Sequence, residues 1–274
     1  MNQRAEHARD SPRPEFVTVG GRRLRHLLAR GTGDAVVLVH GFGGTLENWR
    51  ENHLALASAG WTAAALDLPG HGASSTDVGS GSLEELATAV LEYLDAMGLD
   101  RAHLVGHSMG AAICLVLADR VPQRVRSLTL VGPAGIGQKI NAEFIRGYIG
   151  ARSSEEIEPL MRLLYSDPRH VTEQLLRQAV EYKRREGVVE ALTKIASSRY
   201  GSTPAGRQLR EVAGSVPTLV VWGADDAVVP PPEPGVLARE GIEFHVLQGR
   251  GHMVQVEAAE DVNRLIAALL RASA

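Results

Sequence analysis

The segment Gly-His-Ser-Met-Gly at 106–110 places a serine between two glycines, directly after an apolar run at 102–107. An apolar helical pattern follows at 109–120. A sharp turn between a strand and a helix exposes a serine hydroxyl, and flanking glycines avoid the clash that side chains would cause. The segment therefore predicts that Ser108 is a nucleophile, whereas the five-residue pattern alone would also fit an ordinary turn.

A serine hydroxyl attacks a carbonyl carbon efficiently only when a base accepts its proton, so a histidine is required. The sequence contains ten histidines. His252 is the strongest candidate because it follows the last apolar run, 243–249, in the loop Gly-Arg-Gly-His-Met. If the apolar runs are parallel strands, this loop and Ser108 lie at the same edge of the sheet. We therefore predict that His252 is the general base.

A carboxylate is needed to orient the imidazole and to stabilise its protonated form. Two aspartates, Asp225 and Asp226, follow the apolar run 217–223. Either could serve, and we favour Asp226; the alternative is that both only cap a turn. The expected catalytic set is therefore Ser108, Asp226 and His252, in that chain order.

The negative charge that develops on the substrate carbonyl oxygen needs fixed N–H donors. The backbone N–H of Met109, next to the serine, is one expected donor. The second is expected from the glycine-rich segment 40–44, where we choose the N–H of Phe42. A phosphate-binding loop is the alternative interpretation, but the segment lacks the Lys-Ser/Thr pair of a P-loop and the spacing of a dinucleotide-binding turn.

Two further histidines, His103 and His107, share one face of a predicted strand at a spacing of four. A metal site is an alternative role for them, but no carboxylate or third ligand has a matching spacing. We therefore predict no metal and no cofactor, and we expect His107 to pack behind the serine turn.

The elements that must position these residues follow from the apolar runs, which are continuous rather than alternating. Continuous runs indicate strands buried on both faces of a parallel sheet. Helical patterns such as 82–98 lie between them, so the predicted fold class is α/β with a doubly wound, mostly parallel sheet. Gly20 and Gly21, between two β-like segments, predict an N-terminal hairpin. The predicted buried strands are 35–40, 62–67, 102–107, 127–132, 217–223 and 243–249.

A long stretch without a buried-strand pattern separates the last two runs from the others and carries charged helical patterns instead. It predicts an inserted helical layer at 134–212. The core domain is then formed by 15–133 and 213–274. The polar residues 1–14 are expected to be a flexible tail.

Composition excludes several classes of partner. The formal net charge of −3 and the scattered arginines argue against nucleic acid. The single cysteine, Cys114, allows no internal disulfide and fits a reducing compartment. The N-terminus has no signal-peptide pattern, and no run reaches the ~18 apolar residues that span a bilayer. We expect a cytoplasmic protein without a membrane partner.

Five motifs occur in the order and approximate spacing of the α/β-hydrolase family, which the sequence resembles over nearly its whole length: HGFGG, DLPGHGASS, GHSMG, WGADD and GRGHM. The resemblance implies the triad Ser108, Asp226 and His252, with Phe42 and Met109 at the oxyanion hole. It also implies that the helical insertion is a cap over the active site.

A second resemblance extends into the insertion. The segments RVRSLTLVGPAGIGQKINAEFIRGYI, YKRREGVVEAL and GHMVQVEAAEDVN are similar to the hydrolase-fold domain that follows the lipoyl domain in the acyltransferase component of acetoin dehydrogenase complexes. Neither a lipoyl domain nor the His-x-x-x-Asp-Gly signature of ordinary dihydrolipoamide acyltransferases is found in this sequence, and Gly110-Ala111 stands where that family often has two glycines. The resemblance implies acyl transfer to a thiol as an alternative function.

We therefore expect a serine hydrolase that forms an acyl-enzyme with a small acyl substrate, most simply a carboxylic ester. The alternatives are an acyltransferase to a thiol acceptor and a non-catalytic hydrolase-fold binding protein. A homo-oligomer and an acyl-transfer complex both stay open. The low aromatic content predicts a mainly aliphatic pocket. Its expected wall residues, besides Phe42 and Met109, are Ile136, Phe144, Tyr148 and Met253.

Overall fold

The computed structural model describes residues 12–136, 140–198, 205–233, 237 and 242–273, with the backbone alone at 205–208. Most of the predicted N-terminal tail, 1–14, therefore lies outside the described residues.

The described residues contain one sheet of eight strands in the order β1-β2-β4-β3-β5-β6-β7-β8. The pairs from β4 to β8 across the sheet are parallel, whereas β2 runs antiparallel to both β1 and β4. The predicted fold class and N-terminal hairpin are thus confirmed. The strands are β1 (Glu15–Val19), β2 (Arg22–Ala29), β3 (Ala35–Val39), β4 (Thr62–Leu66), β5 (Ala102–His107), β6 (Val125–Val131), β7 (Thr218–Gly223) and β8 (Glu243–Leu247).

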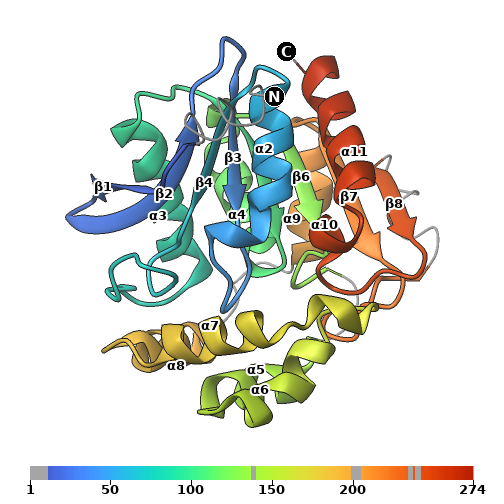
Figure 1. Cartoon of the computed structure of the whole chain (residues 1–274). Coiled ribbons are helices and arrows are strands. Elements are labelled where there is room, and N and C mark those ends of the chain that lie inside the picture. Colours follow the sequence, from blue (N-terminus) through green and yellow to red (C-terminus); the bar gives the residue numbers. More distant parts are fainter. Residues whose placement is uncertain (1–11, 137–139, 199–204, 234–236, 238–241, 274) are drawn as a thin grey trace, which may run out of the picture.

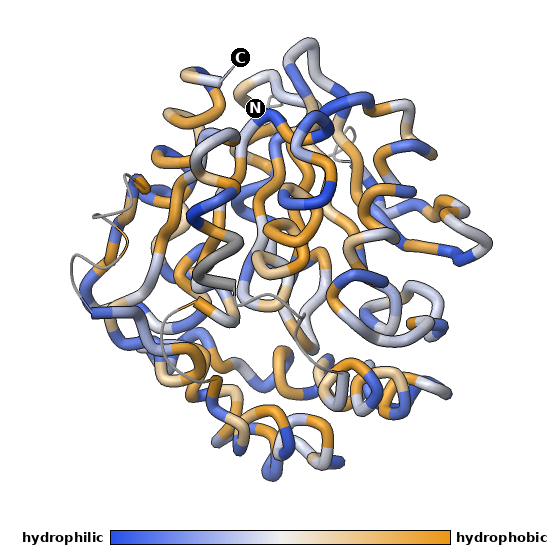
Figure 2. Tube along the Cα trace, turned by 180° about the vertical axis from the view of Figure 1, so that it is seen from behind, coloured by the Kyte–Doolittle hydropathy of each residue, from blue (hydrophilic) through white to orange (hydrophobic). Residues whose placement is uncertain are grey.

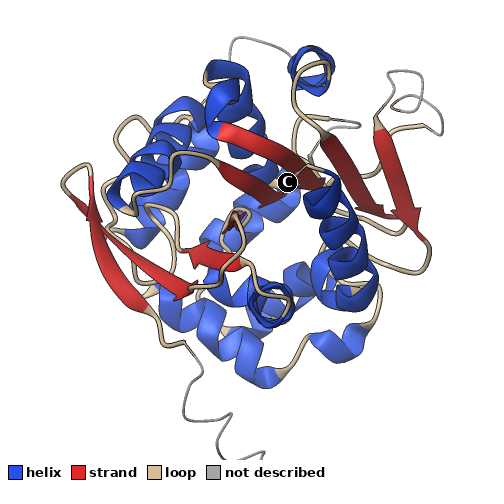
Figure 3. Cartoon of the chain, turned by 90° about the horizontal axis from the view of Figure 1, so that it is seen from above, coloured by secondary structure: helices blue, strands red, loops and turns tan. Residues whose placement is uncertain are grey.

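Helices cover both faces of this sheet (Figure 1, and Figure 3 from above). One face carries α3 (Leu83–Ala96), α4 (Met109–Arg120) and α9 (Ala205–Ala213), and the other carries α2 (Arg50–Ser58) and α11 (Ala259–Ala272). The shorter elements are η1 (Leu46–Trp49), η2 (Pro122–Arg124), η3 (Pro168–His170) and α10 (Val254–Glu257).

The central strand β3 is apolar at every position because alternate side chains enter different hydrophobic clusters. Val37 and Val39 of β3 pack with α3 and α4, while Val36 and Leu38 pack with α2 and α11. All five residues of this strand are buried. The hydropathy colouring of Figure 2 shows this apolar core along the middle of the molecule.

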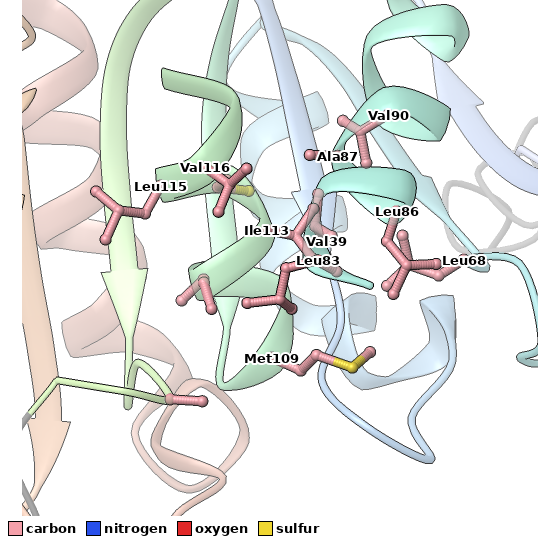
Figure 4. Close-up of a cluster of buried hydrophobic side chains, with 14 of the residues drawn as sticks. Val39, Leu68, Leu83, Leu86, Ala87, Val90, Met109, Ile113, Leu115 and Val116 are labelled. Atoms are coloured by element: carbon pink, nitrogen blue, oxygen red, sulfur yellow. The ribbon is translucent and has the colours of Figure 1, made fainter. Parts of the chain in front are cut away.

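The packing of α3 against α4 fixes the helix that follows Ser108. Figure 4 shows Leu83 of α3 close to Ile113 of α4 and to Val39 of the sheet, while Leu86 of α3 lies beside Leu68. Every residue of α4 from Met109 to Ala118 is buried. A helix enclosed in this way holds its first turn rigidly at the carboxyl edge of the sheet.

Four helices between β6 and β7 form a separate layer at the end of the sheet toward which the parallel strands point (Figure 1). We call these helices the helical insert: α5 (Ala142–Gly150), α6 (Ser154–Arg162), α7 (Glu173–Lys183) and α8 (Val188–Ser197). The range predicted for the insertion, 134–212, also includes most of α9. That helix instead packs against α4, with Leu209 and Val212 buried in the core.

None of the helices in the described ranges is both long and apolar enough to cross a membrane.

Candidate active site

Ser108 lies in a strained turn between β5 and α4. Its φ is 52° and its ψ is −114°. It is the one non-glycine residue in the described part of the chain with a positive φ. Its N–H donates to the carbonyl of Val131 at 2.9 Å, which ties the turn to the neighbouring strand. Such a conformation costs about 1–3 kcal/mol and persists only where the surroundings enforce it.

The glycines around Ser108 are required by close backbone contacts. A Cβ on Gly106 would lie 2.4 Å from the carbonyl oxygen of Gly110, and a Cβ on Gly110 would lie 2.2 Å from that of Val39. A Cβ on Gly41 would lie 3.1 Å from the Cβ of Ser108. Because Gly41 and Gly110 carry no side chain, the segment after β3 can approach the serine turn this closely.

His252 and Asp226 form a buried hydrogen-bonded pair. The Nδ1 of His252 lies 2.7 Å from Oδ2 of Asp226, and the exposed fractions of the two side chains are 3% and 0%. Because a carboxylate only accepts, Nδ1 carries the proton and the Nε2 of the neutral ring is left as an acceptor. Ser108 and His252 line the same cavity. The arrangement has the donors and acceptors that proton removal from a serine requires.

Asp226 is oriented by its other hydrogen bonds. Its Oδ1 accepts from the N–H of Val228 at 2.9 Å and from that of Val229 at 2.7 Å, and its Oδ2 accepts from the indole of Trp222 at 3.2 Å. Asp225, the alternative, is exposed and accepts from the hydroxyl of Ser166. Of the two aspartates, Asp226 therefore contacts the histidine.

His107 supports the loop that carries His252. Its Nε2 donates to the carbonyl of His252 at 3.0 Å, and the two rings lie 4.6 Å apart. Burial holds the pKa of His107 well below its usual value, so this ring is neutral. His103 instead contacts Ser127, 2.8 Å from its Nδ1. Within the described residues, no group of three or more His, Cys, Asp or Glu could hold a metal ion.

The segment 41–44 is fixed at its start by His40, and we call it the oxyanion loop after the donor predicted at Phe42. The Nε2 of His40 accepts from the N–H of Leu68 at 3.0 Å, so its Nδ1 must be the protonated nitrogen that donates to the Gly41 carbonyl at 2.8 Å. The N–H of Gly44 donates to the same carbonyl at 3.0 Å. Burial lowers the pKa of His40 to about 4, which keeps this tautomer neutral. His40 was not among the predicted site residues, although it opens the glycine-rich motif.

The two predicted oxyanion donors belong to residues that line the same cavity as Ser108. Met109 is the first residue of α4, where backbone N–H groups have no acceptor within the helix. Phe42 is half-buried in the oxyanion loop, and both residues line the cavity beside Ser108. Their roles at an oxyanion remain a prediction.

The cavity has a volume of about 630 Å³ and lies between the sheet edge and the helical insert. Three of the predicted wall residues, Phe144, Tyr148 and Met253, line it, whereas Ile136 is buried in the core outside its lining. Sequence periodicity could not identify the other apolar lining residues because it does not tell which face of an insert helix meets the core. They include Ala134, Ile145, Met161, Leu164, Leu175 and Val228.

The exposed rim of the cavity is polar, unlike its buried end. Arg25 is half-buried there and lies 2.8 Å from the buried Asp67 and 3.5 Å from Glu47, so most of its charge is compensated. Burial raises the pKa of Asp67, and the charge of Arg25 opposes this shift. The exposed rim residues are Glu47, Arg50, Thr172, Gln174 and Gln178.

The helical insert is also hydrogen-bonded to the histidine loop. The carboxylate of Glu257 accepts from the N–H of Gly251 at 2.6 Å and from that of Asp167 at 2.8 Å. The N–H of Met253 donates to the carbonyl of Leu164 at 2.9 Å. Of the residues on both sides of His252, Met253 is thus bonded directly, and Gly251 through Glu257, to the segment that follows α6.

Fold and site together define a class of protein. Residues 34–259 match the family described as the alpha/beta hydrolase fold. The chain belongs to the α/β-hydrolase family.

Individual relatives point to more than one activity. The chain is 46% identical over 263 residues, which is 95% of this chain and 70% of the relative, to the dihydrolipoyllysine-residue acetyltransferase component of the acetoin cleaving system of Pseudomonas putida. It is 31% identical over 268 residues, 91% of this chain and 92% of the relative, to the 2-hydroxy-6-oxononadienedioate/2-hydroxy-6-oxononatrienedioate hydrolase of Paraburkholderia phymatum. The first similarity confirms the resemblance to the acetoin-system component.

The fold also matches solved structures. A meta-cleavage product hydrolase from Pseudomonas fluorescens IP01 has a TM-score of 0.80 with this chain at 23% identity, covering 95% of this chain and 98% of the other.

Proposed function

We propose that the protein is a serine hydrolase that cleaves a carboxylic ester through an acyl-enzyme. In this mechanism Ser108 attacks the carbonyl carbon while the Nε2 of His252 accepts the hydroxyl proton. Asp226 holds the imidazole in the required tautomer and stabilises the cation that forms. The N–H groups of Phe42 and Met109 bind the oxyanion. His252 then protonates the leaving alcohol, and water attacks the acyl-enzyme with His252 again as base.

The buried His252–Asp226 pair beside a strained serine is the observation that carries this proposal. Burial of the pair strengthens its electrostatic interaction, because charges attract more strongly in a low-dielectric surrounding. Glycine would adopt the φ of 52° without strain, so joining β5 to α4 does not by itself require a serine at this turn. Strain of this kind is concentrated at functional sites.

The apolar buried end of the cavity, with Phe144 and Met161 among its residues, suits the acyl group. The polar rim suits the alcohol portion. A cavity of this volume lies in the range of about 300–1,000 Å³ typical of drug-sized ligands, so it has room for more than a short acyl chain.

Acyl transfer to a thiol is the second candidate, and the 46% identical acetyltransferase component favours it. Such a reaction shares the acyl-enzyme of Ser108 but replaces water by a thiolate in the second step. The similarity to the Paraburkholderia hydrolase favours a further test substrate, 2-hydroxy-6-oxononadienedioate.

We also propose that the partner is a small acyl molecule rather than a nucleic acid or membrane, and that the protein works in the cytoplasm. The free, buried thiol of Cys114 fits a reducing compartment. A homo-oligomer and an acyl-transfer complex are both compatible with this proposal.

The experiment is activity-based labelling of the full chain followed by substrate profiling. A fluorophosphonate is expected to modify Ser108, as located by peptide mass spectrometry, and p-nitrophenyl esters of two to eight carbons are expected to be hydrolysed. Ser108→Ala should abolish both signals. If the wild-type protein neither labels nor cleaves any ester or dienoate, the hydrolase proposal is wrong, and a binding protein becomes the better interpretation.

Product analysis with dihydrolipoamide or coenzyme A separates the first two candidates. Thioester formation faster than ester hydrolysis would favour the acyltransferase. Thioester formation no faster than without protein would exclude it.

A further inference from the structure

We propose that Tyr148, which belongs to the helical insert, positions the oxyanion loop, and that Lys183 acts through Tyr148. The inference rests on the proposed function, because it matters only if the N–H of Phe42 binds an oxyanion. It assigns a part in catalysis to a helix that carries none of the triad residues.

Tyr148 touches the oxyanion loop in two ways. Its hydroxyl donates to the carbonyl of Gly43 at 2.9 Å. Its ring lies so close to Gly43 that a Cβ there would be 2.4 Å from the Cε1 atom. Gly43 has a φ of 68°, which glycine adopts without strain. The loop and the ring therefore fit each other only with glycine at this position.

These contacts fix the peptide units around Phe42 from both sides. The carbonyl before Phe42, that of Gly41, accepts from His40 and Gly44. The carbonyl of Gly43, which lies one peptide unit beyond the carbonyl of Phe42 itself, accepts from Tyr148. The ring of Phe42 also meets the ring of Tyr148 edge to face, with centroids 6.2 Å apart. The peptide units before and after the 42–43 unit are therefore both held. Because the Phe42 N–H belongs to the first of them, its direction is set in advance, as an oxyanion donor requires.

Lys183 holds the end of the helix that carries Tyr148. Its ammonium donates to the carbonyls of Tyr148 at 2.7 Å and Ala151 at 2.6 Å, and it lies 4.9 Å from the centre of the tyrosine ring. The last carbonyls of a helix lack partners within it and favour a nearby cation. Lys183 is only 6% exposed, so water has little access to replace its hydrogen bonds to these carbonyls.

Both groups are in the protonation state that these contacts need. Burial raises the pKa of Tyr148, so its hydroxyl keeps the proton that it donates. Burial lowers the pKa of Lys183 to about 8, which leaves the amine mainly protonated at pH 7.

The test compares Tyr148→Phe with Tyr93→Phe in the full chain. Each substitution removes one buried tyrosine hydroxyl; that of Tyr93 contacts His26 at 2.9 Å in the core, outside the cavity lining. Tyr148→Phe is expected to lower kcat for p-nitrophenyl acetate by about ten- to a hundredfold, with KM within about twofold, because a misplaced reacting group can cost about 10² in rate. The rate constant for fluorophosphonate labelling should fall by a similar factor. Tyr93→Phe should change Tm but not kcat.

A double-mutant cycle tests the part of Lys183. Lys183→Met keeps the aliphatic stem and is expected to lower kcat severalfold in the wild-type background. In the Tyr148→Phe background it should lower kcat by less than twofold, because the route to the oxyanion loop is already broken. Equal fold-changes in the two backgrounds would overturn the role of Lys183. If Lys183→Met does not fold, the same cycle is run with Lys183→Gln, which removes the charge, and it is judged in the same way.

The outcomes separate this inference from the proposed function. A wild-type protein that does not label at Ser108 contradicts the proposed function itself. A wild-type protein that labels, with Tyr148→Phe labelling at the same rate and turning over with the same kcat, overturns only the positioning role. A rise in KM alone would also overturn it, since that would make Tyr148 a substrate contact rather than a positioning residue.

Discussion

The Nδ1 of His252 lies 2.7 Å from Oδ2 of Asp226, although the two residues are 26 positions apart in the chain. They meet because β7 and β8 are parallel neighbours, so the segments that follow both strands leave the sheet at the same edge. Trp222, at the end of β7, donates to Asp226 and prevents the carboxylate from turning away. The pair is therefore set by the sheet and not by the substrate.

Replacing the carboxylate tests this relationship directly. Asp226→Asn keeps the shape of the side chain but can present an amide N–H to Nδ1, which favours the wrong tautomer of His252. We expect kcat to fall by about 10³–10⁴, as the loss of such an aspartate does in serine proteases. Asp225→Asn is the matched control, because Asp225 is exposed and contacts Ser166 instead. Its kcat should stay within about twofold of wild type; an equal loss in both variants would refute the assignment.

Gly110, the second residue after Ser108, should be required for full stability of the fold. In Gly110→Ala the new methyl would lie 2.2 Å from the Val39 carbonyl oxygen and 2.4 Å from that of His40. We expect the free energy of unfolding in urea to fall by about 3 kcal/mol, at the upper end of the cost of overpacking. Gly150→Ala is the control, since nothing lies within 4 Å of its Cβ position. It should change stability by less than about 1 kcal/mol.

Acid should destabilise the fold through its buried histidines. Burial lowers the pKa of His40 to about 4 and that of His71 to about 3, whereas both titrate near 6.5 when the chain is unfolded. Between pH 6.5 and about 4 the unfolded state therefore binds more protons than the folded state, and stability falls as the pH falls.

His71→Phe tests this pH dependence, because the new ring can keep the stacking on Tyr182 but takes up no proton. The loss of stability between pH 6.5 and 4.5 should be smaller in this variant, by roughly 1 kcal/mol per pH unit at the acid end. Urea unfolding at several pH values measures it. Parallel stability curves for the variant and the wild type would contradict the prediction.

Glu257 should contribute to both stability and turnover because it links the loop that carries His252 to the segment after α6. Its two carboxylate oxygens accept from Gly251 and Asp167. Glu257→Gln leaves one of these backbone N–H groups facing an amide NH₂, so we expect a loss of about 1.5–3 kcal/mol in stability and a lower kcat. Glu260→Gln, at an exposed position of α11, should change stability by no more than about 0.5 kcal/mol. If both variants are equally stable, the bridge between the histidine loop and the helical insert contributes little.

The sequence was sufficient for the strands and the three triad candidates because each depends on local patterns. The apolar run 217–223 contains β7, and the helical pattern at 82–98 contains α3. Both could be predicted because a continuous apolar run indicates a buried strand and helical periodicity indicates an amphipathic helix, whatever the rest of the fold. The sequence favours Asp226 over Asp225 as the partner of His252, but two adjacent aspartates cannot be distinguished by residue type alone. What separates them is the direction in which each side chain leaves the turn.

Contacts between distant segments were beyond sequence patterns. The periodicity of α9 indicates that one face is apolar, but not that this face meets α4 instead of the helical insert. Phe144 and Ile136 are equally apolar, yet only Phe144 reaches the cavity. The hydroxyl of Tyr148 and the carboxylate of Glu257 contact backbone groups. Every residue has such groups, so the sequence gives no sign of these contacts except the glycines at 43 and 251.

Those two glycines limit how the insert could be exchanged between relatives. Gly43 fits against a tyrosine ring of α5, and a Cβ on Gly251 would lie 2.8 Å from the Leu164 carbonyl oxygen. A chimaera that took its four helices from another hydrolase would therefore need helices that leave room for both loops and supply the same hydrogen bonds. Grafting the helices alone should alter turnover as well as substrate choice, so specificity in such a protein could not be redesigned as an independent module.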